Sequence, residues 1–245
     1  FDYFTLVQLY QFNYKGHEDA PGVPIITPEN AEEAAANGCA RSTVKETYEF
    51  ILGDLNKAIE LLANTKKTRS DKRYVSLDVA YGIRARVHLT MHNYADALKD
   101  AEAALASTSS VPYSSAAVSK PTFIDIEDAS WMWGILITDK DRVSTTGICN
   151  FPSHMGSLNY GYASVGGWRR ISPKLYNQIP ESDVRKGWFL DDTGVSVNLP
   201  AAAQAYITKK GAPVYTQVKY GPMNDEWGSN NNATDVILMR VEEMY

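Results

Sequence analysis

The feature that most constrains the fold of this chain is a stripe of apolar residues that begins just after Thr43. The stripe advances mostly at steps of three and four, which places its members on one face of a helix. These members are Val44, Tyr48, Ile51, Leu52, Leu55, Ile59 and Leu62. Thr43 and Glu46 also have capping-box spacing, in which each side chain accepts the backbone amide of the other residue. The pattern predicts an amphipathic helix over 43–63.

Two further helices are expected over 76–91 and 94–106, separated by the short break His92-Asn93. The first carries an apolar face of Val79, Ala80, Ile83, Val87 and Met91. The second carries Tyr94, Ala97, Leu98, Ala101, Ala104 and Leu105 on one face. Small residues let a neighbouring helix approach closely, so we expect an antiparallel hairpin with Ala101 at the contact. The spacing fits a tetratricopeptide (TPR) repeat, although its usual glycine and terminal proline are missing. The alternative that these helices belong to an unrelated helical bundle stays open.

The helical pattern fades between 107 and 235, where Gly, Pro, Ser, Asn and Tyr become frequent. Short strands are expected at 130–137 and 214–220, and a short helix at 171–179, with Pro173 in its first turn. So long a stretch without long helices exceeds an ordinary loop. We therefore expect a mainly α protein with a long irregular, loop-rich insertion. Its regions would be a TPR-like part over 1–107, a ligand-binding part over 108–235, and the start of a further TPR-like helix over 236–245.

Charge and composition exclude several classes of function. The net charge of −5 and the pI near 5.4 do not suit a nucleic-acid partner. No run approaches the roughly 20 apolar residues of a membrane-spanning helix. Cys39 and Cys149 form neither a disulfide framework nor a zinc pattern. Both ends fall inside apolar patterns, so we expect the chain to be a piece of a longer protein.

Candidate catalytic and metal-binding residues are few. His88 and His92 are four apart in an expected helix, the spacing of a two-histidine metal site, but Leu89 stands where a zinc protease has glutamate. The acidic pairs Asp139/Asp141 and Asp191-Asp192 stand in loops, where charge is ordinary. No phosphate-binding loop or nucleophile elbow is present. We therefore expect no metal, no cofactor and no catalysis. The sequon at Asn232 is a common chance triplet.

Aromatic residues set among glycines are the best candidates for ligand contact. They occur in Asn159-Tyr160-Gly-Tyr162 and in Gly166-Gly-Trp168-Arg169, and Asp225-Glu-Trp227-Gly forms a similar loop. A sugar ring has an apolar face of C–H groups that stacks on tyrosine or tryptophan, while polar groups take its hydroxyls. We therefore expect glycan contacts at Tyr160, Tyr162, Trp168 and Arg169. The alternative is that these rings pin the irregular region to the helices.

Four blocks follow one another in a set order along the chain. Residues 41–58 carry R-S-T-V-K-E-T-Y and then I-L-G-D-L and Ala58, and residues 80–97 carry A-Y-G-I-R-A-R-V-H-L and then Asn93-Tyr94 and Ala97. Residues 182–186 read S-D-V-R-K, and residues 236–245 read V-I-L-M-R-V-E-E-M-Y. Together the blocks resemble the SusD/RagB family of outer-membrane nutrient-binding lipoproteins, and the chain would be a central portion of such a protein.

The resemblance implies a non-catalytic accessory subunit of a nutrient importer. Such a subunit sits on the extracellular face of the outer membrane, held by a lipid anchor outside this chain. Its partners are a TonB-dependent, SusC-like transporter and an oligosaccharide, or in some members a peptide. The helical hairpins carry the loop-rich half, which holds the ligand site. Two other readings stay open: a TPR-type scaffold that binds a protein or peptide, and a glycosidase with helical decoration.

Overall fold

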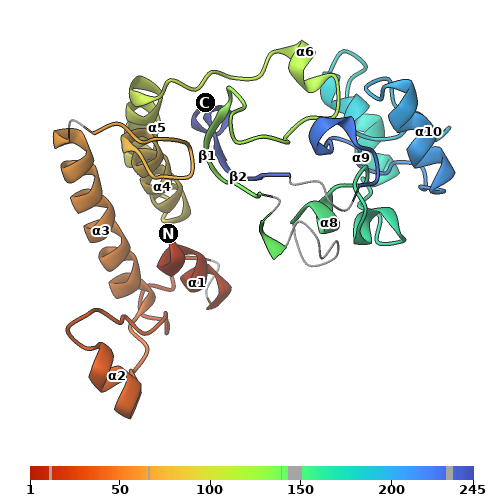
Figure 1. The fold of residues 1–245 in the computed structure, drawn as a ribbon. Helices are drawn as coiled ribbons and strands as arrows, with labels where there is room; N and C mark the ends of the chain where they lie inside the picture. The colour runs from red at the N-terminus through yellow and green to blue at the C-terminus, as the bar shows by residue number, and fades with distance from the viewer. Residues whose placement is uncertain (11–12, 66, 139, 143–150, 230–233) are drawn as a thin grey trace. The chain divides into compact units, whose positions relative to one another are not determined.

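The computed structural model describes residues 1–245 except 11–12, 66, 139, 143–150 and 230–233 (Figure 1). Asp139, Cys149 and Asn232, singled out above, lie outside the described residues. The chain divides into two compact units. Unit 1 comprises residues 1–70, 74–109 and 243–245, and unit 2 comprises residues 71–73 and 110–242. In the described part of the chain, no helix is long and apolar enough to cross a membrane.

Unit 1 is built from helices. They are α1 (Asp2–Tyr10), α2 (Ala31–Asn37), α3 (Val44–Asn64), α4 (Leu77–Thr90) and α5 (Tyr94–Ser107). The three helices expected over 43–63, 76–91 and 94–106 are confirmed to within one residue at each end. The short helix α2 was not expected, because it buries no side chain and so shows no apolar stripe.

The start of α3 shows why this helix forms where the sequence places it. The hydroxyl of Thr43 accepts the backbone amide of Glu46 at 3.1 Å, and the Glu46 carboxylate accepts the Thr43 amide at 2.7 Å. Both halves of the capping box are therefore present. Further along the helix, the Tyr48 ring is fully buried and meets the rings of Phe4 and Tyr14 edge to face. The apolar stripe thus holds the N-terminal segments against α3.

Helices α4 and α5 pack together as a hairpin, joined by the short turn at 91–93. The buried positions of α5 are Ala97, Asp100 and Ala104, whereas Ala101 is only partly buried. Tyr94 and Leu98, expected on the buried face, are instead 62% and 60% exposed. The reason is an ion pair between Asp100 and Arg84 of α4, which turns the arc that contains Asp100 toward α4. The apolar pattern in the sequence therefore spans a wider arc of α5 than the arc that is buried in the structure.

Unit 2 consists of short elements joined by long irregular segments. They are α6 (Ser115–Val118), β1 (Trp131–Ile135), α8 (Phe151–Met155), η1 (Tyr162–Ser164), α9 (Pro173–Gln178), η2 (Val184–Trp188), α10 (Ala201–Lys209), η3 (Met223–Asp225) and β2 (Val236–Arg240). A last turn of 3-10 helix, η4 (Val241–Met244), follows β2. The expected short helix at 171–179 is confirmed as α9, which begins at Pro173 with the Ser172 hydroxyl as its cap.

The expectation of a helix starting at residue 236 is wrong. Residues 236–240 form β2, which pairs antiparallel with β1, with Trp131 opposite Arg240 and Ile135 opposite Val236. A short apolar run does not distinguish a strand from a buried helix by periodicity alone. The strand forms because β1, about a hundred residues earlier in the sequence, supplies the hydrogen-bonding partner. Only 241–244 are helical, as a single 3-10 turn.

The strand expected at 214–220 is present only as isolated bridges. Thr216 pairs with Arg170, Gln217 with Phe189, and Tyr220 with Thr122. Because each bridge goes to a different segment, no continuous ladder forms. The segment instead ties three separate parts of unit 2 together.

Among the described residues of unit 2, two hydrophobic clusters hold the unit together. The cluster that we call the Leu158 cluster contains Leu158, Leu190, Ala203, Ile207 and Val218, all at most 1% exposed. The second contains Phe123, Ile126 and Trp131. Trp131 is fully buried as expected, whereas its neighbour Trp133 is only partly buried. The irregular backbone of unit 2 is therefore fixed by packing and not by long helices or a large sheet.

Candidate functional site

The loop at 160–169 carries the four residues expected to contact a ligand. Tyr160 is 41% exposed and Tyr162 is 46% exposed, so both rings reach the surface of unit 2. The Tyr162 ring lies 5.1 Å from the His154 ring at an interplanar angle of 37°. This contact supports one side of the tyrosine and leaves much of the ring open to solvent.

Hydrogen bonds and a close backbone contact fix the shape of this loop. The Tyr162 carbonyl accepts the amide of Gly167 at 2.7 Å, which folds the loop back on itself. Gly161 has φ +153, and a Cβ there would lie 2.4 Å from the Ser153 hydroxyl oxygen. Only glycine allows this approach to α8. Tyr160 and Tyr162 therefore stand on a backbone that is held in place.

Trp168 and Arg169 occupy different environments. Trp168 is partly buried and packs against the Leu158 cluster, as does Trp227. Its ring thus pins the loop to the core and still reaches the surface. Arg169 is exposed; its guanidinium donates to the Gly167 carbonyl at 3.2 Å, and its own carbonyl accepts the Gln217 amide at 2.7 Å. Their roles in ligand binding stay predictions.

Unit 2 also contains a hollow of about 670 Å³, which we call the larger hollow. It is lined by residues 113, 117, 120–122, 124–125, 128, 197–200, 223–225 and 227. Its aromatic members are Tyr113 and Trp227. Of these, the sequence pattern pointed only to Trp227. Tyr113 stands in a segment without neighbouring glycines or aromatics, so it gave no sequence signal.

A hydrogen-bond network holds Tyr113 in the wall of the larger hollow. Its hydroxyl donates to the Asp128 carboxylate and accepts the indole N–H of Trp131 at 3.0 Å. Its backbone amide donates to Glu242 at 2.7 Å. Burial raises the pKa of the Tyr113 hydroxyl and that of the Asp128 carboxyl. The phenol therefore stays neutral, and its ring is fixed before any ligand arrives.

A second depression of about 330 Å³, the smaller hollow, lies in the same unit. Tyr176 and Phe189 contribute rings to its wall, and Glu181, Asp183, Lys186 and Asp191 contribute charge. The Lys186 ammonium lies 5.1 Å from the centre of the Tyr176 ring and pairs with Glu181. Arg185 lowers the pKa of Asp183 to about 2 by hydrogen bonding to its carboxylate. Val197 and Asn198 line both hollows.

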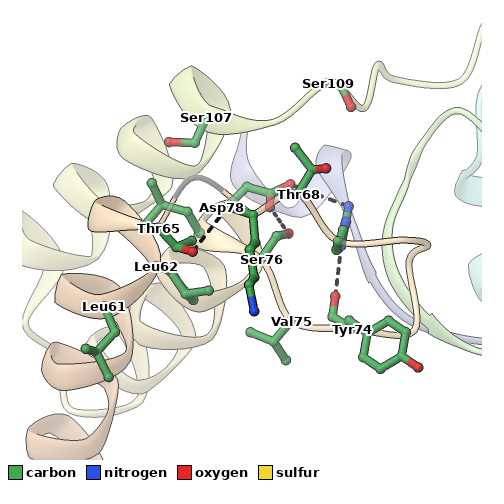
Figure 2. A pocket seen from close by; sticks show the side chains of 13 residues that line it. Leu61, Leu62, Thr65, Thr68, Tyr74, Val75, Ser76, Asp78, Ser107 and Ser109 are labelled. Carbon is green, nitrogen blue, oxygen red and sulfur yellow. Dashed lines mark hydrogen bonds and ion pairs between the residues drawn. The ribbon is translucent and has the colours of Figure 1, made fainter.

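Unit 1 has a pocket of its own, of about 770 Å³, at the ends of its helices (Figure 2). Leu61 and Leu62 reach it from α3, Ser107 from α5, and Tyr74 and Val75 from the segment before α4. Asp78 is 4% exposed; its carboxylate accepts the Ser76 hydroxyl and lies 4.0 Å from the Arg69 guanidinium. The pocket combines exposed apolar side chains with a charged floor.

The histidines expected on one helix face do not share it. Helix α4 ends at Thr90, and His92 follows in a left-handed turn with φ 63, its ring stacked on Tyr94 at 5.7 Å. His88 instead lies with Nε2 3.8 Å from the Asp100 carboxylate. Over the residues that the structure describes, no three His, Cys, Asp or Glu side chains gather as a metal site would require.

The acidic loop residues serve local structure. The Asp191 carboxylate accepts the backbone amides of Thr193 and Val195 at 2.8 and 3.0 Å. The Asp141 carboxylate accepts the amide of Thr138 at 2.8 Å. Each carboxylate thus closes a turn in its own segment.

Comparisons with known proteins agree with this architecture. Residues 1–89 match the model of a SusD-like family described as starch-binding and associating with the outer membrane. None of the curated proteins matches the chain. A SusD-like carbohydrate-binding protein from Bacteroides vulgatus superposes on 99% of the chain with a TM-score of 0.73 and 24% identity. A SusD superfamily protein from Bacteroides thetaiotaomicron covers 99% with a TM-score of 0.71 and 20% identity.

A third similar structure has a bound glycan. It is surface glycan-binding protein A from Bacteroides thetaiotaomicron in complex with laminarihexaose, with a TM-score of 0.59, 16% identity and 97% of this chain covered. The chain spans 46%, 50% and 53% of these three solved chains, about half of their length.

The fold is therefore that of the SusD superfamily: TPR-like helices followed by a loop-rich unit. The SusD-like family model matches residues 1–89, which are part of the helical unit 1. The resemblance drawn from the four sequence blocks and the expected mainly helical fold class are both confirmed.

Proposed function

We propose that the protein is a non-catalytic, glycan-binding accessory subunit of an outer-membrane nutrient importer. The family description names starch binding and association with the outer membrane, and two of the similar structures are named for carbohydrate or glycan binding. The protein would capture an oligosaccharide outside the cell and deliver it to a TonB-dependent transporter. It would act without a metal or cofactor.

The observation that carries this proposal is the exposure of aromatic rings on a fixed loop. Tyr160 and Tyr162 each leave more than two-fifths of their surface open, on a backbone held by Gly161 and Gly167. A ring held in place loses little freedom on binding, so more of the stacking energy appears as affinity. Trp168 and Arg169 would extend the surface with a further ring and with hydrogen-bond donors for hydroxyl groups.

The test is glycan binding by the full-length protein and its variants, measured by calorimetry after a glycan-array screen. Losing one stacked ring costs on the order of 1–2 kcal/mol, which is about a tenfold loss of affinity. We expect this loss for Tyr160→Ala, Tyr162→Ala and Trp168→Ala. Because Trp168 also packs on the Leu158 cluster, its variant needs a melting curve beside the binding curve.

Tyr94→Ala is the matched control for these variants. Tyr94 is 62% exposed but lies on α5 in unit 1, so its removal should leave glycan affinity unchanged. Normal binding by all three loop variants would show that the loop is not the site. Absence of binding to any glycan would end the proposal itself.

The transporter partnership has its own test. The full-length protein, isolated from outer membranes of the source bacterium with mild detergent, should co-purify with a TonB-dependent transporter. Recovery of the protein only from the cytoplasm would contradict both the partnership and the proposed capture outside the cell. Incubation with the bound oligosaccharide should release no shorter products, since we propose capture without catalysis.

A second candidate function is peptide binding by the TPR-like unit, and the pocket at the helix ends of unit 1 favours it (Figure 2). Its exposed apolar residues, Leu61, Tyr74 and Val75, could take the side chain of an extended peptide. A peptide-array screen of the wild type against Tyr74→Ala separates the two functions, because this variant should not change glycan binding.

A further inference from the structure

We infer that the larger and smaller hollows of unit 2 form one groove that takes an extended, uncharged oligosaccharide. This inference rests on the proposed glycan-binding function and adds to it the length and charge class of the ligand. Three observations support it: shared residues between the hollows, aromatic rings in the lining of both hollows, and the charge of the lining.

Val197 and Asn198 belong to the walls of both hollows, which makes the hollows adjacent. Val197 is 91% exposed and lines both hollows, so we place it on the ridge that separates them. Such exposure of an isolated valine offers an apolar contact to anything that crosses from one hollow to the other. The side chain would meet the C–H face of a sugar that passes over it.

Asn198, in contrast, is held rigidly beneath the ridge. It is 9% exposed, and its side-chain amide nitrogen lies 3.3 Å from the Val184 carbonyl and 3.4 Å from the Val118 carbonyl. A Cβ on Gly187 would come within 2.5 Å of the Asn198 amide group, so the two residues are in the closest possible contact. The backbone at Val197 and Asn198 is therefore fixed, and with it the boundary between the two hollows.

Each of the two hollows has aromatic residues in its lining. In the larger hollow these rings are Tyr113, whose hydroxyl is bonded to Asp128, and Trp227, which packs on the Leu158 cluster. In the smaller hollow Tyr176 is braced by Tyr215, with ring centres 5.2 Å apart. Rings at separated points suit a ligand with repeated apolar faces, as in a chain of sugars. Trp168 packs on the same cluster as Trp227, so the loop at 160–169 and the larger hollow share one support.

The charge of the lining selects among glycans. Among the described lining residues, the acids are Asp125, Asp128, Asp225, Glu181, Asp183 and Asp191, and the lysines are Lys120 and Lys186. Lys186 pairs with Glu181, and Arg185 pairs with Asp183. The larger hollow then has three acids, Asp125, Asp128 and Asp225, beside Lys120, and the smaller hollow has Asp191. A negative lining repels anionic ligands within about 8–10 Å at ordinary salt. Uronic acids and sulfated sugars should therefore be excluded, whereas neutral sugars pay no such cost.

The experiment measures binding of the full-length protein to laminari- and malto-oligosaccharides of one to six residues, and to uronic-acid oligosaccharides of the same lengths. We expect affinity for uncharged chains to rise with length until both hollows are filled. We expect oligouronates of every length to bind at least tenfold more weakly than neutral chains. Val197→Asp should weaken binding of the longest neutral chain while leaving the fold intact, since this side chain is almost entirely exposed.

Two pairs of variants sharpen the result. Tyr176→Ala and Trp227→Ala should each weaken the hexasaccharide about tenfold, whereas a disaccharide should be sensitive to at most one of them. Because Trp227 packs on a core cluster, Val197→Asp serves as the variant that needs no refolding check. Asp125→Asn with Asp225→Asn should raise affinity for oligouronates, because the double variant removes two negative charges from the lining of the larger hollow.

The outcomes separate this inference from the proposed function. If neutral hexasaccharides bind but Val197→Asp and Tyr176→Ala have no effect, the groove is wrong and glycan binding stands. If oligouronates bind as well as neutral chains, the charge selection is wrong. If no glycan of either class binds, the proposed function fails and the groove fails with it.

Discussion

The guanidinium of Arg84 on α4 donates two parallel hydrogen bonds to the carboxylate of Asp100 on α5, from Nε to Oδ2 at 2.7 Å and from Nη2 to Oδ1 at 2.6 Å. The arginine side chain is 20% exposed and the aspartate side chain 7% exposed. A two-pronged pair fixes geometry as well as charge, because the planar fork matches the carboxylate in one orientation. The pair therefore sets the rotation of α5 against α4.

Asp100→Asn should destabilise the hairpin by about 2–3 kcal/mol, somewhat less than the roughly 3–5 kcal/mol of a fully buried pair. The loss arises because Arg84 keeps its charge in a partly buried position without its carboxylate partner. Urea unfolding measures it. Asp96→Asn is the control, since the pair of Asp96 with Lys99 is exposed and should change stability by less than about 1 kcal/mol. An equal loss of unfolding free energy in both variants would show that the buried pair stabilises the protein no more than the exposed pair does.

Ala104→Leu should cost about 1–3 kcal/mol by overpacking the contact between α4 and α5. Ala104 is fully buried, so a larger side chain has no space without moving a helix. Ala101→Leu, at the position that the sequence placed at the helix contact, should cost less because Ala101 is only partly buried. Ala106→Leu on the exposed face should leave the melting temperature unchanged. A melting temperature for Ala104→Leu equal to that of the wild type would contradict the close approach of the helices.

Glu46→Gln should destabilise the protein near pH 7 and have a progressively smaller effect in acid. Hydrogen bonds from the Thr43 amide and hydroxyl lower the pKa of the Glu46 carboxyl below its ordinary 4.5. The folded state therefore favours the ionised form, and its stabilisation is complete above about pH 4.5 and is lost as the pH falls through the lowered pKa. Urea unfolding of the two proteins between pH 3 and pH 7 measures the difference.

Thr43→Ala tests the same capping box from the other side. It removes the hydroxyl that accepts the Glu46 amide and should cost about 1 kcal/mol. For Glu46→Gln, the contradicting result is a difference in unfolding free energy from the wild type that stays constant between pH 3 and pH 7. It would mean that the ionised carboxylate does not stabilise the helix.

Gly161→Ala should weaken glycan binding although residue 161 offers no side chain to a ligand. An added Cβ would collide with Ser153 at 2.4 Å and displace the loop that carries Tyr160 and Tyr162. We expect a loss of about tenfold, comparable to removing one ring. Gly53→Ala on α3 is the control, because no atom lies within 4 Å of its added Cβ. Calorimetric titration with the glycan identified on the array measures these affinities. Unchanged affinity for Gly161→Ala would show that the shape of the loop is unimportant for binding.

Helices α3, α4 and α5 of unit 1 were predictable because their information is local. The capping box at Thr43 and Glu46 and the apolar steps along α3 lie within one segment, and the structure reproduces them within a residue. The same local pattern misplaced Tyr94 and Leu98, because the exposed and buried arcs of α5 depend on Arg84, which belongs to another helix. The exposure of Tyr160 and Tyr162 agrees with their place among glycines, outside any periodic apolar pattern. Their role in ligand binding stays a prediction.

The sequence by itself determined the three longest helices, α3, α4 and α5, and the part of the chain that lacks long helices, since capping, periodicity and glycine content act between near neighbours. Only the tertiary structure decided that Val236–Arg240 is a strand, because its partner Trp131–Ile135 is distant in the chain. Only the tertiary structure brought Tyr113, Val197 and Trp227 to one hollow. These choices depend on contacts between distant segments, whose formation depends on the packing of the whole unit and not on any local spacing.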